Sequence, residues 1–195
     1  MSTAMLEEGN EKKHTYADYC AWDTEKRYEL INGEAWMMSA PGVIHQTISR
    51  ELLGQFWNFL KGKPCRVFAA PLDVRLFPRE DDGDDTVLQP DLLVVCDGEK
   101  LADGRSCRGA PDLVAEILSS SNTWKYLSLK FQLYLKAGVR EYWLIEPETR
   151  IIQVHLLKEG EPDCYLSRVY RDPQFLEVSV LPGLTIDAAG IRRAS

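Results

Sequence analysis

Apolar and polar residues alternate along the chain with two periods, one typical of helices and one typical of strands. Between 43 and 60, apolar residues recur at steps of three and four, which predicts one long helix with a single buried face. A second helix is predicted over 122–137, and a shorter one over 16–22. The short helix follows Thr15, which forms a capping-box pattern with Asp18.

Strands are predicted where β-branched and aromatic residues form short runs between turn residues. The clearest case is a hairpin in which strands over 27–31 and 34–38 flank Asn32-Gly33, a dipeptide suited to a type I′ turn because both positions need positive φ. The mixed order of helices and strands predicts an α/β or α+β fold, a central mixed sheet flanked by helices. Further strands are predicted over 65–77, 86–96, 111–118, 141–147, 151–157, 164–170 and 177–180.

Length and composition indicate an ordinary folded domain. The 195 residues favour one domain over 1–195, with 1–14 as a flexible N-terminal segment. Hydrophobic residues make up 45% and charged residues 27%, which excludes long disordered or collagen-like chains. No run approaches the roughly 18 apolar residues of a membrane span, and the N-terminus lacks an apolar secretory segment. We therefore expect a cytoplasmic protein with no membrane association.

The five cysteines are scattered and include no CxxC pair. An odd count without an export signal argues against a disulfide framework or a thiolate zinc site, so we expect all five to be reduced.

The net charge of −7 has the wrong sign for a protein that holds nucleic acid by bulk electrostatics. One basic residue and eight acids lie in 79–99, so this segment alone sums to −7 and the remainder is neutral. A local basic face is therefore still compatible with the sequence. The acidic stretch 79–85 lacks the ligand spacing of a calcium loop, which predicts a solvated hairpin end.

Two of the predicted strands carry an acid where apolar residues are expected. By alternation, Asp91 shares a face with Leu93, and Glu116 shares one with Val114. Burying an unpaired carboxylate costs several kcal/mol, so two neighbouring acids should bind a cation or share protons and basic partners. A divalent metal is the simplest solution. Acids at strand ends that point into solvent are the alternative.

The helix predicted over 122–137 places Lys130 at the edge of its apolar stripe. From this edge the ammonium could reach the carboxylate pair, or the side chain could lie along the border of the buried face as a snorkelling lysine. The stripe expected to face the sheet consists of Trp124, Leu127, Phe131, Tyr134 and Leu135.

Taken together, these segments resemble a known protein family. The run RYELINGE, then His45, QPDLLVV, PDLVAEILSSS, Lys130 and GVREYWLIEP are similar to the Uma-type family of bacterial restriction endonucleases, a branch of the PD-(D/E)xK nuclease superfamily. The similarity extends roughly from Tyr16 to Leu184, and its most specific part is the ordered combination of these pieces. The resemblance implies a restriction-endonuclease-like core.

The resemblance also implies a metal site. Asp91 and Glu116 match the family's metal ligands, with Mg²⁺ as the expected cofactor and Mn²⁺ as its alternative. Superfamily members usually carry a lysine two residues after the second acid, where this chain has Leu118. In this family the lysine moves to the following helix, and Lys130 matches it.

Two further residues match the family, and two depart from it. Glu29 matches an N-terminal acid expected to complete the metal shell or orient water, and His45 matches a histidine that could contact substrate. The family often has Asp where this chain has Tyr126, and Pro where it has Ser120. An altered or lost activity would follow if that Asp normally holds the lysine or a metal-bound water.

The function implied is a metal-dependent endonuclease that hydrolyses DNA phosphodiester bonds, with Glu29, Asp91, Glu116 and Lys130 as its catalytic residues. DNA is then the partner, and a homodimer is expected by analogy with nucleases that cut two strands with one site per subunit. The alternative is a catalytically inactive nuclease-fold protein that serves as a binding or scaffold protein, which the net charge of −7 favours.

Overall fold

The computed structural model of the chain describes residues 13–119 and 123–194. Its helices are α1 (Tyr16–Cys20), α2 (Val43–Leu60), α3 (Trp124–Ala137) and α4 (Ala189–Ala194), with a 3-10 turn over Gly98–Leu101. Its strands are β1 (Tyr28–Ile31), β2 (Glu34–Met37), β3 (Arg66–Ala69), β4 (Asp73–Arg75), β5 (Val87–Leu88), β6 (Leu92–Val95), β7 (Ser106–Arg108), β8 (Leu113–Ile117), β9 (Glu141–Glu146), β10 (Ile151–Lys158), β11 (Glu161–Arg171), β12 (Phe175–Glu177) and β13 (Thr185–Asp187).

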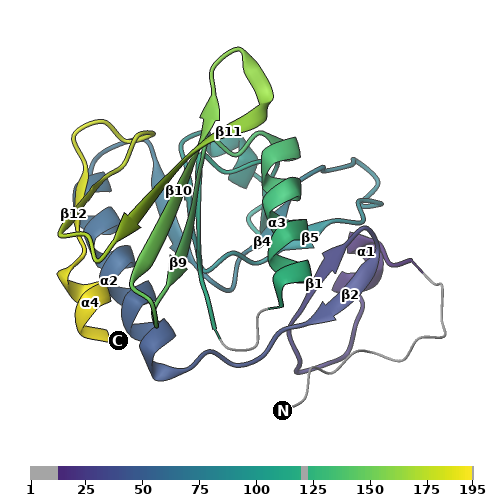
Figure 1. Cartoon of the computed structure of the whole chain (residues 1–195). Helices are drawn as coiled ribbons and strands as arrows, with labels where there is room; N and C mark the ends of the chain where they lie inside the picture. Colours follow the sequence, from purple (N-terminus) through teal and green to yellow (C-terminus); the bar gives the residue numbers. More distant parts are fainter. Residues whose placement is uncertain (1–12, 120–122, 195) are drawn as a thin grey trace.

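Within the described residues, the strands form three sheets (Figure 1). The largest has six strands in the order β11-β10-β9-β8-β6-β3, and the second has five in the order β2-β1-β5-β4-β7. The remaining pair, β12 and β13, lies near α4. The six-stranded sheet is mixed, because β8 and β9 are parallel while its other neighbours are antiparallel.

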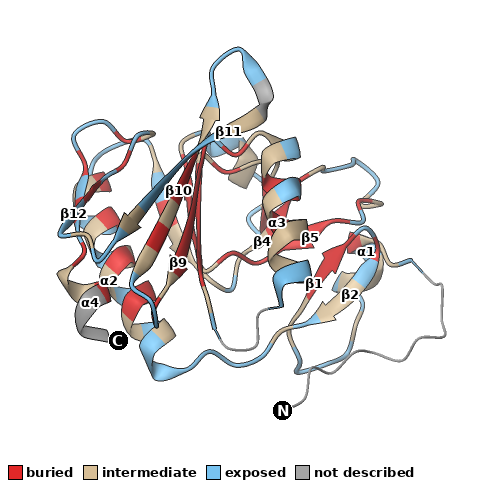
Figure 2. Ribbon diagram, viewed as in Figure 1, coloured by how far each residue is buried: buried red, intermediate tan, exposed pale blue. Residues whose placement is uncertain are grey.

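Two helices cover the two faces of the six-stranded sheet, and the buried residues concentrate between these layers (Figure 2). On one face, Ile48 and Phe56 of α2 pack in a cluster that includes Trp143. On the other face, Leu133 and Tyr134 of α3 pack in a second cluster. The predicted central mixed sheet with flanking helices is confirmed.

The predicted hairpin is also confirmed. Asn32 and Gly33 both have positive φ, at 52° and 83°, which a type I′ turn requires. A Cβ added at Gly33 would lie 2.7 Å from the Cβ of Lys13, so the turn leaves no room for a side chain. The register pairs Glu29 with Trp36 across the two strands.

Two predicted long strands are each divided between the two large sheets. The strand predicted over 65–77 becomes β3 and β4, and that over 86–96 becomes β5 and β6. β3 pairs with β6 in the six-stranded sheet, whereas β4 pairs with β5 in the five-stranded sheet. The breaks contain Pro71 and Pro90, which have no N–H for the strand ladder. Asp91 therefore lies where the chain passes from one sheet to the other.

The predicted orientation of α3 is wrong by part of a turn. Lys130, placed at the edge by periodicity, is buried together with Leu133 and Tyr134. Trp124, expected to face the sheet, is 78% exposed. Lys130 faces inward because its ion-pair partners lie on the neighbouring strands. Hydrophobic periodicity carries no information about such partners, so it predicts the wrong face for this lysine.

The acidic stretch 79–85 is not simply a solvated hairpin end. Asp84 is 2% exposed, and its carboxylate forms a bidentate ion pair with the guanidinium of Arg75, which is fully buried. Asp82 contacts the same guanidinium at 2.8 Å. Glu80 is exposed, as expected for a loop tip. The prediction from the sequence is wrong for Asp84 because its basic partner, Arg75, lies on β4, outside residues 79–85.

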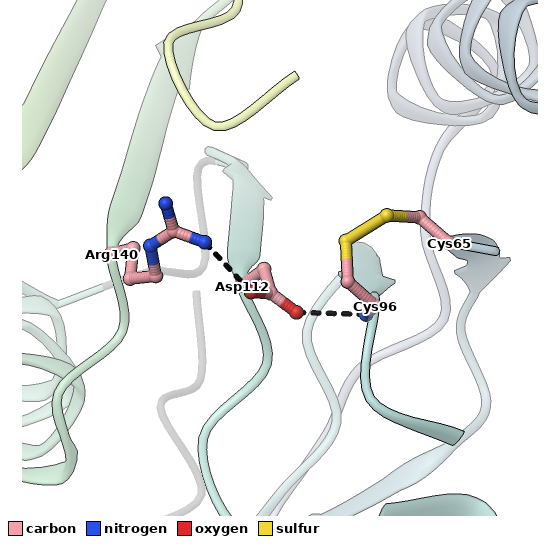
Figure 3. The surroundings of a disulfide bond; sticks show 4 residues. All are labelled: Cys65, Cys96, Asp112 and Arg140. Atoms are coloured by element: carbon pink, nitrogen blue, oxygen red, sulfur yellow. Dashed lines mark hydrogen bonds and ion pairs between the residues drawn. A yellow bond between two sulfur atoms is a disulfide. The ribbon is translucent and has the colours of Figure 1, made fainter. Parts of the chain in front are cut away.

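The expectation of five reduced cysteines is wrong for one pair. Cys65 and Cys96 form a disulfide at adjoining ends of β3 and β6 (Figure 3). Next to it, Asp112 accepts a hydrogen bond from the backbone N–H of Cys96 at 2.8 Å and contacts Arg140 at 3.1 Å. The two cysteines are 31 positions apart, and only the antiparallel register of β3 and β6 brings them together.

The C-terminal region differs in detail from the prediction. The strand predicted over 177–180 is displaced to β12, which pairs with β13. α4, which packs against α2, was not predicted. The strand predicted over 164–170 lies within the longer β11. Such short elements depend on tertiary packing more than on local propensity, and their boundaries carry a weak sequence signal.

Some expectations concern parts of the chain outside the described residues, namely 1–12 of the predicted flexible segment and the departure at Ser120. At the end of that segment, the backbone N–H of His14 donates to the carbonyl of Gly33 at 2.8 Å. None of the helices in the described ranges is long and apolar enough to cross a membrane.

Candidate active site

Three of the predicted site residues meet in one buried cluster. Glu29 lies on β1, Glu116 on β8 and Lys130 on α3, so the cluster joins both large sheets and the helix that covers them. The Nζ atom of Lys130 lies 3.0 Å from Oε1 of Glu29 and 2.5 Å from Oε1 of Glu116. Lys130 is 2% exposed and Glu29 is fully buried. The two acids and the lysine are therefore direct ion-pair partners.

Asp91 joins this cluster through the strand that carries Glu116. Its Oδ2 atom accepts a hydrogen bond at 2.7 Å from the backbone N–H of Ile117, the residue after Glu116. The Nε2 atom of His45, in the first turn of α2, lies 3.1 Å from the same oxygen. Asp91 and His45 are thus held together beside Glu116.

Glu29 has a different environment from the one expected of a metal ligand. Its Oε1 accepts hydrogen bonds from the backbone N–H of Gln89, at 2.7 Å, and from Lys130. Its Oε2 accepts a hydrogen bond from the hydroxyl of Tyr126. Both oxygens are therefore occupied, and Glu29 is placed to hold Lys130.

Tyr126, a departure from the family pattern, is part of the cluster. Its ring packs against Trp36, with centroids 5.6 Å apart, and Trp36 is the cross-strand neighbour of Glu29 in the hairpin. A tyrosine hydroxyl at this position thus supplies a neutral hydrogen-bond donor to Glu29.

Tyr134 is the residue that sequence reasoning missed. It was assigned only to the apolar stripe of its helix, but its buried hydroxyl donates to Oε1 of Glu116 at 2.7 Å. The signal that could have identified it is its position four residues after Lys130, which places the two side chains on one helix face.

Burial dominates the electrostatics of the cluster. Burial, together with the negative charges of Asp91 and Glu29, raises the pKa of Glu116 to about 7 against the opposing charge of Lys130. Burial alone would lower the pKa of Lys130, but Glu116 and Glu29 outweigh it and hold that pKa well above its ordinary value. Lys130 therefore remains an ammonium ion at neutral pH.

The pKa of His45 is raised as well. Burial acts to lower it, but the hydrogen bond to Asp91 and the charges of Asp91 and Glu116 prevail. Its Nδ1 atom is buried and, among the described residues, has no hydrogen-bond partner. His45 thus carries a proton more readily than an isolated histidine, with Asp91 as its counter-charge.

The remaining donors fit a water-rich magnesium site. Within residues 13–119 and 123–194, Oδ1 of Asp91 and Oε2 of Glu116 receive no hydrogen bond. Mg²⁺ is commonly bound by one or two carboxylates together with waters and substrate phosphate, so two free oxygens suffice. In the same part of the chain, no three His, Cys, Asp or Glu side chains form a group that could enclose a metal. The donor set thus suits a hydrated cation rather than an all-protein cage.

Comparison with solved structures gives a fold match that spans nearly the whole chain. The crystal structure of a "putative nuclease belonging to DUF820" from Anabaena variabilis ATCC 29413 matches with a TM-score of 0.73 at 20% sequence identity. The match covers 93% of this chain and 98% of the other. At this identity the similarity concerns the fold. No match was found among curated proteins.

Comparison with family models identifies the relatives of the chain. The model of the Uma2 family, described as "Putative restriction endonuclease", matches residues 15–189. This range contains all of the predicted site residues, from Glu29 to Lys130. Because the match extends over most of the sequence, the chain belongs to the Uma2 family of restriction-endonuclease-like nucleases.

Proposed function

We propose that the chain is a divalent-metal-dependent endonuclease that hydrolyses DNA phosphodiester bonds. Membership of a restriction-endonuclease family supports a nuclease that acts on DNA. The observation that carries the finer proposal is the ion pair of Lys130 with one oxygen of Glu116, on a strand whose next residue, Ile117, donates its backbone N–H to Asp91. A cation site and a fixed positive charge next to one another are the two parts that phosphodiester hydrolysis needs.

Asp91 and Glu116 are the residues that would hold Mg²⁺, with Mn²⁺ as an alternative. When bound, such a cation polarises a phosphodiester oxygen and lowers the pKa of a bound water. Glu116, whose pKa is about 7, would have to be ionised to hold such a cation.

Lys130 is assigned to charge stabilisation rather than to proton abstraction. A general base must be neutral, whereas Glu116 and Glu29 keep Lys130 protonated. Its ammonium can instead stabilise the negative charge that grows on phosphorane oxygens. The proton of the attacking water then goes to an acceptor other than Lys130.

Glu29 and His45 act through these residues in the proposal. Glu29 holds Lys130 by the 3.0 Å ion pair, and His45 orients Asp91 through its Nε2 atom. The expected contact of His45 with substrate stays a prediction. Because one such cluster lies in the described part of the chain, we further propose a homodimer for cleavage of both strands.

The test compares Asp91→Ala with Asp112→Ala in plasmid nicking with Mg²⁺ or Mn²⁺. Asp112 is a matched control, because it also accepts one backbone N–H bond and faces one basic side chain but lies by the disulfide. We expect Asp91→Ala to lose about 100-fold or more of the nicking rate and Asp112→Ala to retain it. Equal rates in wild type and Asp91→Ala would refute the proposal.

A non-catalytic scaffold is the second candidate, and one observation favours it. Lys130 bridges Glu29 and Glu116 directly, so this part of the cluster is stable without a cation. On this alternative, wild type and Asp91→Ala would show the same background nicking and the same absence of Mn²⁺ binding.

A further inference from the structure

Two tyrosines flank Lys130 on α3, and each donates a hydrogen bond to a different carboxylate. Tyr126, Lys130 and Tyr134 are spaced four residues apart, so they lie on one face of the helix. The hydroxyl of Tyr126 bonds to Glu29, and that of Tyr134 bonds to Glu116. The two acids thus accept hydrogen bonds from one lysine and from two neutral hydroxyl groups.

The hydrogen bonds are distributed differently over the oxygens of the two acids. On Glu29, Tyr126 occupies Oε2 while Lys130 and the backbone of Gln89 occupy Oε1. On Glu116, Tyr134 and Lys130 both contact Oε1. Among the described residues, the first arrangement leaves no oxygen without a hydrogen bond, and the second leaves Oε2 without one.

Both rings are held in place by packing. The ring of Tyr134 is fully buried, with its centroid 5.1 Å from that of Tyr142. The ring of Tyr126 packs against Trp36. The pattern of occupied oxygens is therefore built into the fold.

Building on the proposed function, we propose that Tyr126 and Tyr134 are positioning residues that select the carboxylate for the cation. The hydrogen bond from Tyr126 keeps Glu29 out of the metal shell, so that Glu29 acts only as a partner of Lys130. Tyr134 turns Glu116 so that one oxygen faces the lysine and the other remains available. The cation site is then a two-carboxylate site of Asp91 and Glu116.

The test uses Tyr126→Phe, Tyr134→Phe and Tyr165→Phe in the full chain, with Mn²⁺ alone as the probe. Tyr165 is the matched control, because its hydroxyl also donates one hydrogen bond, at 2.8 Å to the carbonyl of Val139, but contacts no acid of the site. Each variant removes a single hydroxyl and keeps the ring. Titration calorimetry gives the Mn²⁺ affinity, and carboxyl NMR of the metal-free protein gives the protonation midpoint of Glu116.

We expect Tyr134→Phe to weaken Mn²⁺ binding about tenfold, as loss of a hydrogen bond to a metal ligand commonly does. The midpoint of Glu116 should also rise, because a donor to its charged form is lost. Tyr126→Phe should not weaken Mn²⁺ binding, although it should slow nicking, since it disturbs Glu29 and Lys130. Tyr165→Phe should change neither the affinity nor the midpoint.

Two results would overturn the inference while leaving the proposed nuclease intact. One is equal weakening by Tyr126→Phe and Tyr134→Phe, which would make Glu29 a ligand as well. The other is that both variants bind Mn²⁺ as Tyr165→Phe does. The two tyrosines would then have only a structural role. Failure of the wild type to bind Mn²⁺ would instead remove the cation site itself and the proposed function with it.

Discussion

At the scale of single residues, Lys130 is the most constrained side chain of the cluster. Its ammonium is almost completely buried and is balanced by Glu29 and Glu116. An ion pair of this kind adds little net stability compared with an apolar core, but removing one partner leaves the others uncompensated. The folded state therefore depends on Lys130 even before any catalytic role is considered.

Lys130→Met should lower the free energy of unfolding at pH 8 by about 3–5 kcal/mol, because two buried carboxylates lose their cation. The loss should be smaller at pH 5, where Glu116 is protonated. Urea denaturation at the two pH values measures both effects. Lys158→Met is the control, since Lys158 pairs with Glu161 in an exposed bridge worth about 0–1 kcal/mol. Losses of the same size in both variants would contradict the buried ion-pair description.

The raised pKa of Glu116 makes stability depend on pH. Its folded value of about 7 exceeds its ordinary value of 4.5, so the folded state binds more protons than the unfolded state between these limits. The contribution of Glu116 is fully present below pH 4.5 and is lost as the pH rises through 7. The free energy of unfolding of the metal-free protein should therefore fall over this range more steeply in wild type than in Glu116→Gln. Parallel curves from denaturation at several pH values would rule out this linkage.

At the scale of elements, the pairing of β3 with β6 places Asp91 at the edge of the cluster. β6 begins immediately after Asp91 and ends before Cys96, so the disulfide links β3 to the end of β6 that is distant from this acid. Asp112 ties β8 to the same end through the backbone of Cys96 (Figure 3). The two acid-bearing strands are thus fixed to each other away from the site.

Reduction of the disulfide should destabilise the fold. A covalent link across a sequence separation of 31 lowers the entropy of the unfolded chain, which corresponds to about 3–4 kcal/mol. Wild type should lose this amount in urea denaturation with a reductant, and Cys65→Ser should show the lower value with and without it. Cys20→Ser, which changes an exposed free thiol, should behave as wild type. An unchanged wild-type midpoint after verified reduction would show that strand pairing alone holds β3 and β6.

At the scale of the whole molecule, the site exists because two sheets share one helix. The five-stranded sheet supplies Glu29, the six-stranded sheet supplies Glu116, and α3 lies where Lys130 can contact both. The chain crosses between the sheets next to Asp91. Some of the acids in the chain of net charge −7 are paired with a cation nearby, as Asp84 is with Arg75. Overall charge is therefore a poor guide to the potential at the site.

Much of this architecture was accessible from local signals. Helix α2, the hairpin turn at Asn32-Gly33 and the core strands follow from periodicity and turn chemistry, which depend on neighbours in sequence. The ordered motifs pointed to the family, which the family match confirms. Asp91 and Glu116 fall in predicted apolar strands, which is compatible with acids that need partners and with strand-end acids that point into solvent.

Which partners they find was decided by tertiary structure alone. The rotation that buries Lys130, the hydroxyls of Tyr126 and Tyr134 on two different acids, and the disulfide of Cys65 with Cys96 all join residues far apart in sequence. Hydrophobic periodicity indicates which face of a segment is buried. It contains no information about the charges or hydrogen-bond donors on the element packed against that face. The sequence by itself determined most of the elements, the family and the candidate acids. The packing of α3 between two sheets determined which carboxylate oxygens of these acids accept hydrogen bonds and which are left for a ligand.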